Sequence, residues 1–160
     1  MKIPTELKHK PVIVTEDYDS VDGRLAGNSD TKGLSLGLAQ WNDRGKVDIS
    51  AKVWRYTGVK WSRQSEELPI HRVLDLCILL TRAMCYFRDV HRKDKKVDLE
   101  NAHIDSLGLQ GSVLSVNICN DNPKIDEDIE LFMQALRQDD QMLSERFAML
   151  AYLLKELGFR

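Results

Sequence analysis

Long apolar runs, paired cysteine motifs and low-complexity segments are all absent from this sequence of 160 residues. The longest strongly apolar stretch, residues 73–80, is interrupted by Asp75 and is too short to cross a bilayer. The first six residues lack the apolar stretch that follows the charge in a secretory signal. These absences predict a cytoplasmic protein without a membrane partner.

Cysteines and histidines are too few and too irregularly spaced to form a recognisable disulfide or metal framework. No two cysteines have the CxxC spacing, and their odd number fits free thiols in a reducing compartment. There is no GxxxxGK[ST] loop and no GxGxxG turn, and the glycines of residues 33–37 fall inside a strand pattern, where they allow close packing or a bulge. We therefore expect no metal, no cofactor and no catalytic residues. The residues considered are Cys77, Cys85, Cys119, His9, His71, His91 and His103.

The composition that remains is that of an ordinary folded protein, with 42 % hydrophobic and 30 % charged residues. The length fits one hydrophobic core, so we expect a single domain over residues 1–160. Charge is unevenly distributed: residues 44–96 carry 13 Lys and Arg against 6 Asp and Glu, whereas residues 97–160 carry 5 against 12. Either the two halves attract each other, within the fold or across a dimer, or the basic part meets an anion such as nucleic acid.

Alternating apolar residues predict a β-meander in the first half of the chain. A short β-branched strand is expected at 11–15, and a leucine-rich strand at 34–41. A hairpin turn at 42–45 leads into a central strand at 47–56, and a third meander strand is expected at 59–65. The central strand has two different faces: Val47, Ile49, Ala51 and Val53 share one, and Asp48, Ser50, Lys52, Trp54 and Tyr56 share the other.

Helical periodicity follows the meander. A long helix is predicted at 69–90, apolar around so much of its surface that we expect it to be buried on more than one side. A further strand is expected at 112–119, and two closing helices at 126–138 and 140–157, the last one capped by Gly158. The fold class is therefore α+β: an antiparallel β-meander of four to five strands, then a long buried helix and two C-terminal helices. Residues 34–90 form the core of this domain and residues 112–160 its C-terminal extension.

Two features have a superficial catalytic or metal-binding pattern. His71 and Asp75 are one helical turn apart, so they could pair as a general base and its orienting group, or simply form a structural hydrogen bond at the start of a helix. The acidic run at 17–23 has carboxylates near calcium-loop spacing, but Asn28 stands where the bidentate Glu should fall. We interpret both features as structural.

Aromatic and basic residues concentrate on the central strand and the strand expected after it. If the aliphatic face of the central strand covers the long helix, its aromatic and basic face points away from the core. Exposed rings stack on unpaired bases and cations neutralise phosphates, so such a face suits single-stranded nucleic acid. The alternative is that a second layer covers the face and that the rings pack there. The candidate nucleic-acid-binding residues are Lys46, Lys52, Trp54, Arg55, Tyr56, Lys60, Trp61 and Arg63.

Three runs carry a resemblance that extends over the whole chain: residues 8–14 (KHKPVIV), residues 33–50 (GLSLGLAQWNDRGKVDIS) and residues 61–69 (WSRQSEELP). In these runs the sequence resembles an uncharacterised bacterial family of unknown function. That resemblance implies no activity.

A second resemblance covers residues 34–87. Their predicted order of three strands and a long helix is similar to the positive-cofactor-four family of single-stranded-DNA-binding transcriptional coactivators. The central strand of that family reads Ile-Asp-Ile-Arg followed by Tyr or Trp, and residues 47–54 here read VDISAKVW. The resemblance implies DNA binding and a dimer with packed helices, although Ser50 replaces the family's Arg.

We therefore expect a small binding module that is a homo-oligomer, with single-stranded nucleic acid as its candidate partner. The alternative is a protein-interaction or oligomeric structural module without nucleic-acid binding. An enzyme would require a pocket around His71 with a convergent nucleophile or metal.

Overall fold

A computed structural model describes residues 1–42 and 47–160 of the chain. The predicted turn at 42–45 therefore lies largely outside the described residues. The chain divides into two compact units, Met1–Ile78 and Leu79–Arg160, with the boundary inside the long helix α1 (Ile70–Arg92). This division leaves the expectation of one domain untested, and each unit is described by itself below.

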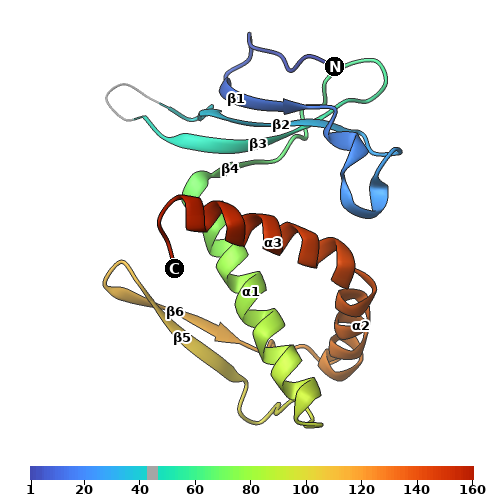
Figure 1. The fold of residues 1–160 in the computed structure, drawn as a ribbon, viewed down its shortest axis with the longest axis vertical. Helices are drawn as coiled ribbons and strands as arrows, with labels where there is room; N and C mark the ends of the chain where they lie inside the picture. Colours follow the sequence, from blue (N-terminus) through green and yellow to red (C-terminus); the bar gives the residue numbers. More distant parts are fainter. Residues whose placement is uncertain (43–46) are drawn as a thin grey trace. The chain divides into compact units, whose positions relative to one another are not determined.

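Unit 1 is built on a four-stranded antiparallel sheet with the order β1-β2-β3-β4 (Figure 1). Its strands are β1 (Lys10–Glu16), β2 (Thr31–Leu38), β3 (Ile49–Arg55) and β4 (Glu67–Pro69). Two short 3-10 turns, η1 (Tyr18–Ser20) and η2 (Gly23–Leu25), lie in the connection from β1 to β2. The α+β prediction and the first three strands are confirmed.

The third meander strand, predicted at 59–65, is wrong. Only a single bridge, Tyr56 to Trp61, forms in that segment, and the strand that pairs with β3 is the three-residue β4. Gly58 has φ +89 and turns the chain as predicted, but Thr57 and Lys60 close a tight loop there instead of starting a strand. The polar residues that follow Trp61 supply no apolar alternation to hold a longer ladder.

Unit 2 contains the rest of α1, a hairpin and two helices. The hairpin consists of β5 (His103–Leu109) and β6 (Ser112–Asn117), and the helices are α2 (Ile125–Gln138) and α3 (Asp140–Glu156). Phe87 of α1, Ile118 after β6 and Ile129 of α2 form its core. The predicted strand near 112–119 and the last two helices are confirmed, whereas β5 was not predicted. None of the described helices is both long and apolar enough to cross a membrane.

Within the single chain α1 is not buried on more than one side, and the expectation that a second subunit covers it stays a prediction. Phe87 is its one buried residue among those described, while Leu74 and Leu76 are more than half exposed. Apolar side chains in the first turns of α1 are thus exposed in the single chain.

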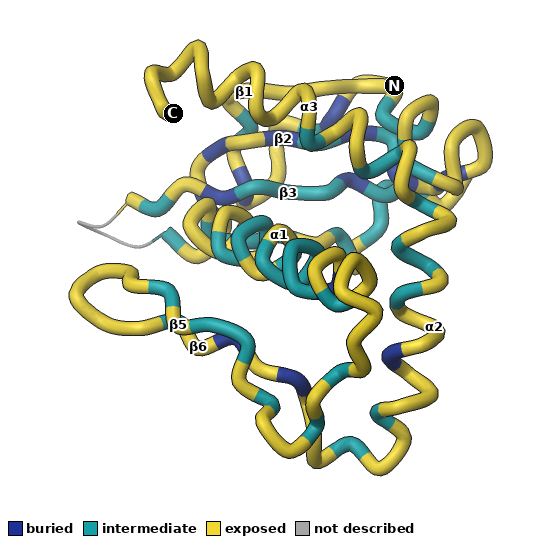
Figure 2. The backbone as a smooth tube through the Cα atoms, turned by 60° about the horizontal axis from the view of Figure 1, so that its bottom comes forward, coloured by how far each residue is buried: buried dark blue, intermediate teal, exposed yellow. Residues whose placement is uncertain are grey.

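The burial of the two sides of the sheet in unit 1 is the reverse of the prediction. The side of β3 with Ser50, Lys52 and Trp54, which was expected to face solvent, is the more buried one. Figure 2 shows buried positions recurring along β2 and β3, and these are the polar and small residues. We call the buried side the polar side; it carries Thr31, Gly33, Ser35 and Gly37 of β2 with Ser50, Lys52 and Trp54 of β3. We call the other the aliphatic side; it carries Ile13, Leu34, Leu36, Leu38, Ile49, Ala51, Val53 and Leu68, none of them fully buried.

The amino-terminal segment, residues 1–9, covers the polar side. A Cβ added at Gly33 would lie 2.7 Å from Cδ1 of Ile3, so the absence of a side chain there lets Ile3 rest on β2. A Cβ at Gly37 would overlap the carbonyl oxygen of Lys10 on the neighbouring strand. The prediction that these glycines permit close packing is confirmed, and that packing buries the polar side.

Candidate functional site

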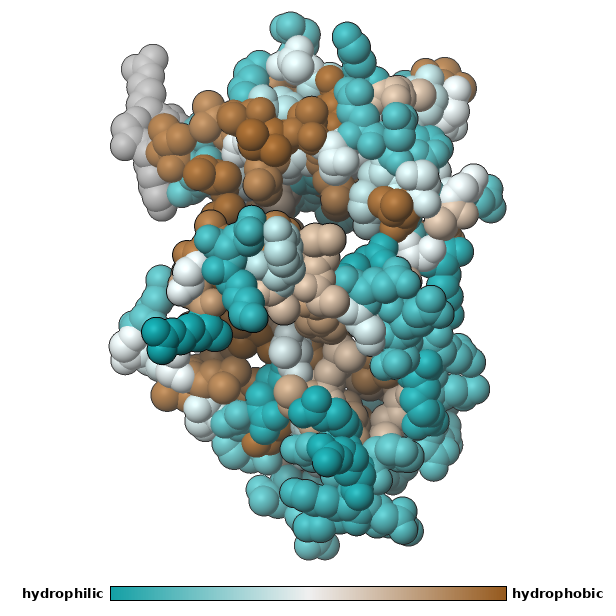
Figure 3. Space-filling view, viewed as in Figure 1, coloured by the Kyte–Doolittle hydropathy of each residue, from teal (hydrophilic) through white to brown (hydrophobic). Residues whose placement is uncertain are grey.

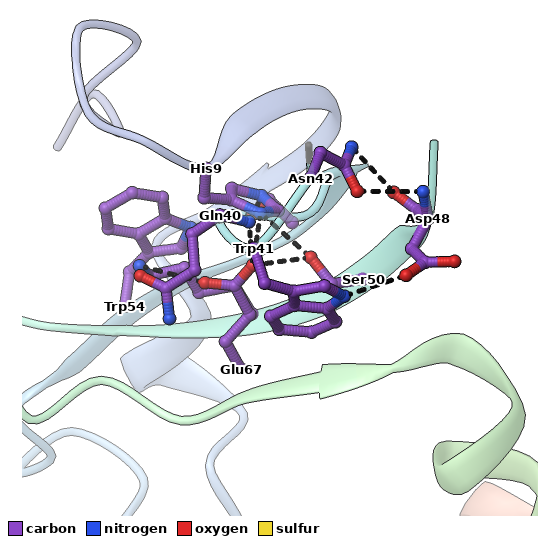
Figure 4. A network of polar contacts seen from close by, with 10 residues as sticks. His9, Gln40, Trp41, Asn42, Asp48, Ser50, Trp54 and Glu67 are labelled. Carbon is purple, nitrogen blue, oxygen red and sulfur yellow. Dashed lines mark hydrogen bonds and ion pairs between the residues drawn. The ribbon is translucent and has the colours of Figure 1, made fainter. Parts of the chain in front are cut away.

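The most organised polar cluster in unit 1 surrounds the carboxylate of Glu67 (Figure 4). Its Oε1 accepts the Ser50 hydroxyl at 2.7 Å and the backbone N–H of Gln40 at 3.0 Å, and lies 3.2 Å from Nδ1 of His9. Lys52 Nζ lies 3.5 Å from the other oxygen, Oε2. The start of β4 thus places one carboxylate where the amino-terminal segment, β3 and the end of β2 meet.

His9 connects this carboxylate to β2. It is 0 % exposed, and its Nε2 lies 2.9 Å from the hydroxyl of Ser35, which also accepts the indole N–H of Trp54 at 2.8 Å. A neutral ring with its proton on Nδ1 fits these contacts: Nδ1–H points to Glu67 Oε1 and to the Ser50 hydroxyl oxygen, 3.1 Å away, and Nε2 accepts from Ser35. The network is therefore compatible with a neutral His9.

The pKa directions agree with this assignment. Burial lowers the pKa of His9 below its ordinary 6.5, and the attraction of Glu67 offsets that only in part. Burial alone would raise the pKa of Glu67, but hydrogen bonds from the Gln40 N–H and Ser50, with the charge of Lys52, lower it below 4.5. The cluster thus holds a neutral imidazole beside a carboxylate that stays ionised.

The order Ser35, His9, Glu67 is that of a serine-hydrolase triad, and Ser35 even stands in a GxSxG spacing. Two observations exclude that chemistry from this arrangement. Ser35 lies in the middle of β2 and not at an exposed strand-to-helix turn, and its hydroxyl is buried and already held by Trp54. What the cluster can do is fasten residues 1–9 to the sheet.

The predicted aromatic platform is wrong, because its central ring is internal. Trp54 is 1 % exposed, with the rings of His9 and Trp61 packed edge-on against it at 5.9 Å. Lys52 lies over the Trp54 ring, 4.6 Å from its centroid, and its ammonium group faces Glu67. The side of β3 expected to face solvent is the side that the amino-terminal segment closes.

The other predicted nucleic-acid-binding residues are dispersed. Arg55 is taken up by ion pairs with Asp30 at 2.7 Å and Glu66 at 2.6 Å, which raise its pKa further. Tyr56 and Trp61 pack on each other at 5.5 Å and are half-buried. Lys60 and Arg63 are exposed, and Lys46 lies outside the described residues. The structure does not bring these side chains onto one open face.

A pocket does lie beside His71, at the first turn of α1. Its volume is about 610 Å³, and Trp41, Asp48, Glu67 and Arg72 are among its lining residues. The lining side chains include no Ser, Thr or Cys, and no metal-holding group of His, Cys, Asp and Glu occurs among the described residues. In the described part of the chain no hydrogen bond joins His71 to Asp75. The described residues that line this pocket therefore supply neither the nucleophile nor the group of metal ligands that an enzyme would need there.

The ends of β2 and β3 are tied together at the rim of this pocket. Trp41 Nε1 donates to the Asp48 carboxylate at 3.0 Å, and the Asn42 side chain accepts from the Asp48 N–H at 2.8 Å (Figure 4).

Sequence reasoning missed His9, Ser35, Ser50 and Glu67 as a cluster. The available signal was that small polar residues alternate with the leucines of β2, as they do on a strand whose polar side packs closely.

The aliphatic side contains a second pocket, of about 420 Å³. Ile13, Leu34, Leu36, Val53 and Leu68 line it together with Val73 of α1. Figure 3 shows hydrophobic side chains gathered over the strands of unit 1. Leu36, at its centre, is 40 % exposed and Ile13 is 63 % exposed. Unit 1 therefore has its aliphatic side chains where a soluble sheet usually has polar ones.

Searches of the curated proteins and of the solved structures found no significant match to the chain. The resemblance of residues 34–87 to the positive-cofactor-four family stays a prediction. One family model matches, over residues 1–159, and its description is that of a family of unknown function, DUF6530. The prediction of an uncharacterised family is thereby confirmed, and the chain belongs to this family of unknown function.

Proposed function

We propose that the protein is a homo-oligomeric interaction module, and that its sheet in unit 1 supplies the association surface. The observation that carries the proposal is the reversed sheet: its polar side is closed by the chain itself, and its aliphatic side is half-exposed. Exposed apolar patches of this kind mark surfaces that another protein covers.

Nucleic-acid binding stays a prediction without a supporting observation. The central ring, Trp54, is buried, Tyr56 and Trp61 pack on each other and are half-buried, and Arg55 is already paired with two carboxylates. Binding through stacking requires open ring faces. We therefore favour the protein-interaction alternative.

Light scattering on the full chain tests the proposal. We expect a mass about twice 18.4 kDa that falls toward the monomer on dilution. Leu36→Lys, which places a charge at the centre of the aliphatic side, should weaken association, whereas Lys60→Glu, a charge change on the 57–65 loop, should not. A mass of 18.4 kDa at every concentration would overturn the proposal.

A further inference from the structure

We propose that unit 2 binds a small amphipathic anion in a pocket that α1 lines together with α2 and α3. The ligand has an apolar body, such as a medium-length acyl chain, and one anionic head group. This inference goes beyond the proposed function, because it concerns unit 2 and requires no second copy of the chain.

The pocket has the size of a small-molecule site. Its volume is about 520 Å³, within the range in which proteins hold cofactors and small ligands. All of its lining residues belong to unit 2. One wall is the carboxyl-terminal half of α1, and the other is formed by the end of α2 and the start of α3, which follow each other at Asp139 (Figure 1).

The walls of the pocket are mainly apolar. On α1, Met84 and Arg88 are four residues apart and Cys85 and Arg88 three, so these side chains share one helix face. Phe87 is buried, and the other apolar lining residues are half-buried. An acyl chain placed here would remove apolar surface of both partners from water. The apolar lining residues are Met84, Cys85, Phe87, Met133, Leu136 and Phe147.

Two guanidinium groups give the pocket its preference for an anion. Arg88 of α1 and Arg137 of α2 line it and are exposed, and neither forms an ion pair with a carboxylate of the described residues. Asp140 is the one carboxylate among the described lining residues. Guanidinium groups bind carboxylate and phosphate oxygens through charge-assisted hydrogen bonds, so an anionic head group fits here and a cationic one does not.

The pocket on the aliphatic side of unit 1 lacks this feature. The only cation among its described lining residues is Lys52, and the Lys52 ammonium group is paired with Glu67. An apolar chain could enter either pocket, but a head group with negative charge finds unpaired arginines only in the one of unit 2. The charge therefore assigns the ligand to unit 2.

Calorimetric titration of the full chain with four ten-carbon probes tests the head group. Decanoate and decyl phosphate should bind at one site per chain. Decan-1-ol and decyltrimethylammonium, which have the same chain without negative charge, should bind at least about tenfold more weakly. The comparison of decanoate with decyl phosphate shows which of the two anions the arginines prefer.

The double variant Arg88→Gln with Arg137→Gln tests the residues. We expect the dissociation constant of decanoate to rise about tenfold or more, because two charge-assisted hydrogen bonds are lost. Arg92→Gln is the matched control, since Arg92 is exposed on the same helix but does not line the pocket. Ser144→Trp, which fills the pocket from an exposed position on α3, should also abolish binding.

Alkylation of the cysteines locates the bound chain by a readout that does not depend on charge. Cys85 lines the pocket and is half-buried, whereas Cys119 is exposed and lies outside it. Decanoate should slow the alkylation of Cys85 and leave that of Cys119 unchanged, as measured by peptide mass spectrometry.

The outcomes separate this inference from the proposed function. Saturable binding of the anions that weakens in the double arginine variant and protects Cys85 supports the inference, whatever the mass of the protein in solution. Binding that survives in this variant but is lost with Leu36→Lys places the chain on the aliphatic side of unit 1 and overturns the inference. Absence of binding, or equal binding of decyltrimethylammonium, overturns it too and leaves the oligomeric module standing.

Discussion

The two sides of the sheet in unit 1 are made by the same strands yet have opposite environments. On one side, Ser35, Ser50 and Trp54 are sealed beneath residues 1–9 and joined by His9 and Glu67. On the other, Leu36 is 40 % exposed and Ile13 is 63 % exposed. Hydrophobicity alone would place the leucines inside, so the comparison shows that hydrogen bonding and close packing at glycines decided which side the chain closes. The aliphatic side is then the surface that we propose a second copy covers.

The largest difference between the two sides should appear when one large side chain is removed from each. Trp54→Ala removes a fully buried ring and one of the two hydrogen bonds of the Ser35 hydroxyl, so we expect a loss of about 3–5 kcal/mol in the free energy of unfolding. Leu36→Ala, on the open side, should cost less than about 1 kcal/mol in the dissociated chain. Urea denaturation at low protein concentration measures both, and equal losses would contradict the assignment of the two sides.

His9 gives the polar side a pH dependence that the aliphatic side lacks. Its pKa is lower in the folded chain than its ordinary 6.5, so the unfolded chain takes up the proton first. The stability contributed by neutral His9 is complete above pH 6.5 and is lost as the pH falls below that value. The lowered pKa of Glu67 acts in the same direction below pH 4.5.

His9→Gln tests this assignment because an amide can bond to the network but cannot titrate in this range. The variant should be less stable at neutral pH by about 1–3 kcal/mol, and its stability should change less than that of the wild type between pH 6.5 and 4.5. Thermal denaturation across this range provides the measurement. Parallel pH profiles for the two proteins would show that His9 is not the titrating group.

A smaller effect is expected where the amino-terminal segment rests on the sheet. Gly33→Ala would bring a methyl group to 2.7 Å from Ile3 and 2.9 Å from the Thr15 carbonyl oxygen, so we expect about 1–2 kcal/mol of destabilisation. Gly108→Ala in β5 is the matched control, since nothing lies within 4 Å of the added Cβ. Proteolysis near residues 1–9 should increase in the first variant alone. An unchanged cleavage rate would place Ile3 elsewhere.

The smallest expected effect is the change in tryptophan fluorescence when nucleic acid is added. Tryptophan fluorescence should stay flat when single-stranded oligonucleotides are added at low salt, because Trp54 is closed in and Trp61 is packed against it. A saturable change that disappears with Trp54→Ala in a still-folded chain would restore the platform that the sequence predicted.

Most of the secondary structure could be predicted from periodicity. The strands at 11–15 and 47–56 and the helices at 126–138 and 140–157 are found within a few residues of where alternation and helical stripes place them. The short β4 was missed because three residues carry too little pattern. β5 was missed because its run of Ser106, Gly108 and polar neighbours has a weak strand composition.

The orientation of the sheet could not be predicted in this way. Periodicity establishes that Leu36 and Ser35 lie on opposite sides, but not which side is covered. That was decided by contacts distant in sequence: His9 reaches Ser35 across 26 positions and Glu67 across 58. The polar cluster could not be predicted for the same reason, because its members are distant in sequence and form no short motif.

Light scattering tests the central claim most directly, because the account assigns the aliphatic side of the sheet to a second copy of the chain. We expect a mass about twice 18.4 kDa that falls toward 18.4 kDa with Leu36→Lys, while Lys60→Glu leaves the mass unchanged. A wild-type mass of 18.4 kDa at every protein concentration would contradict the account.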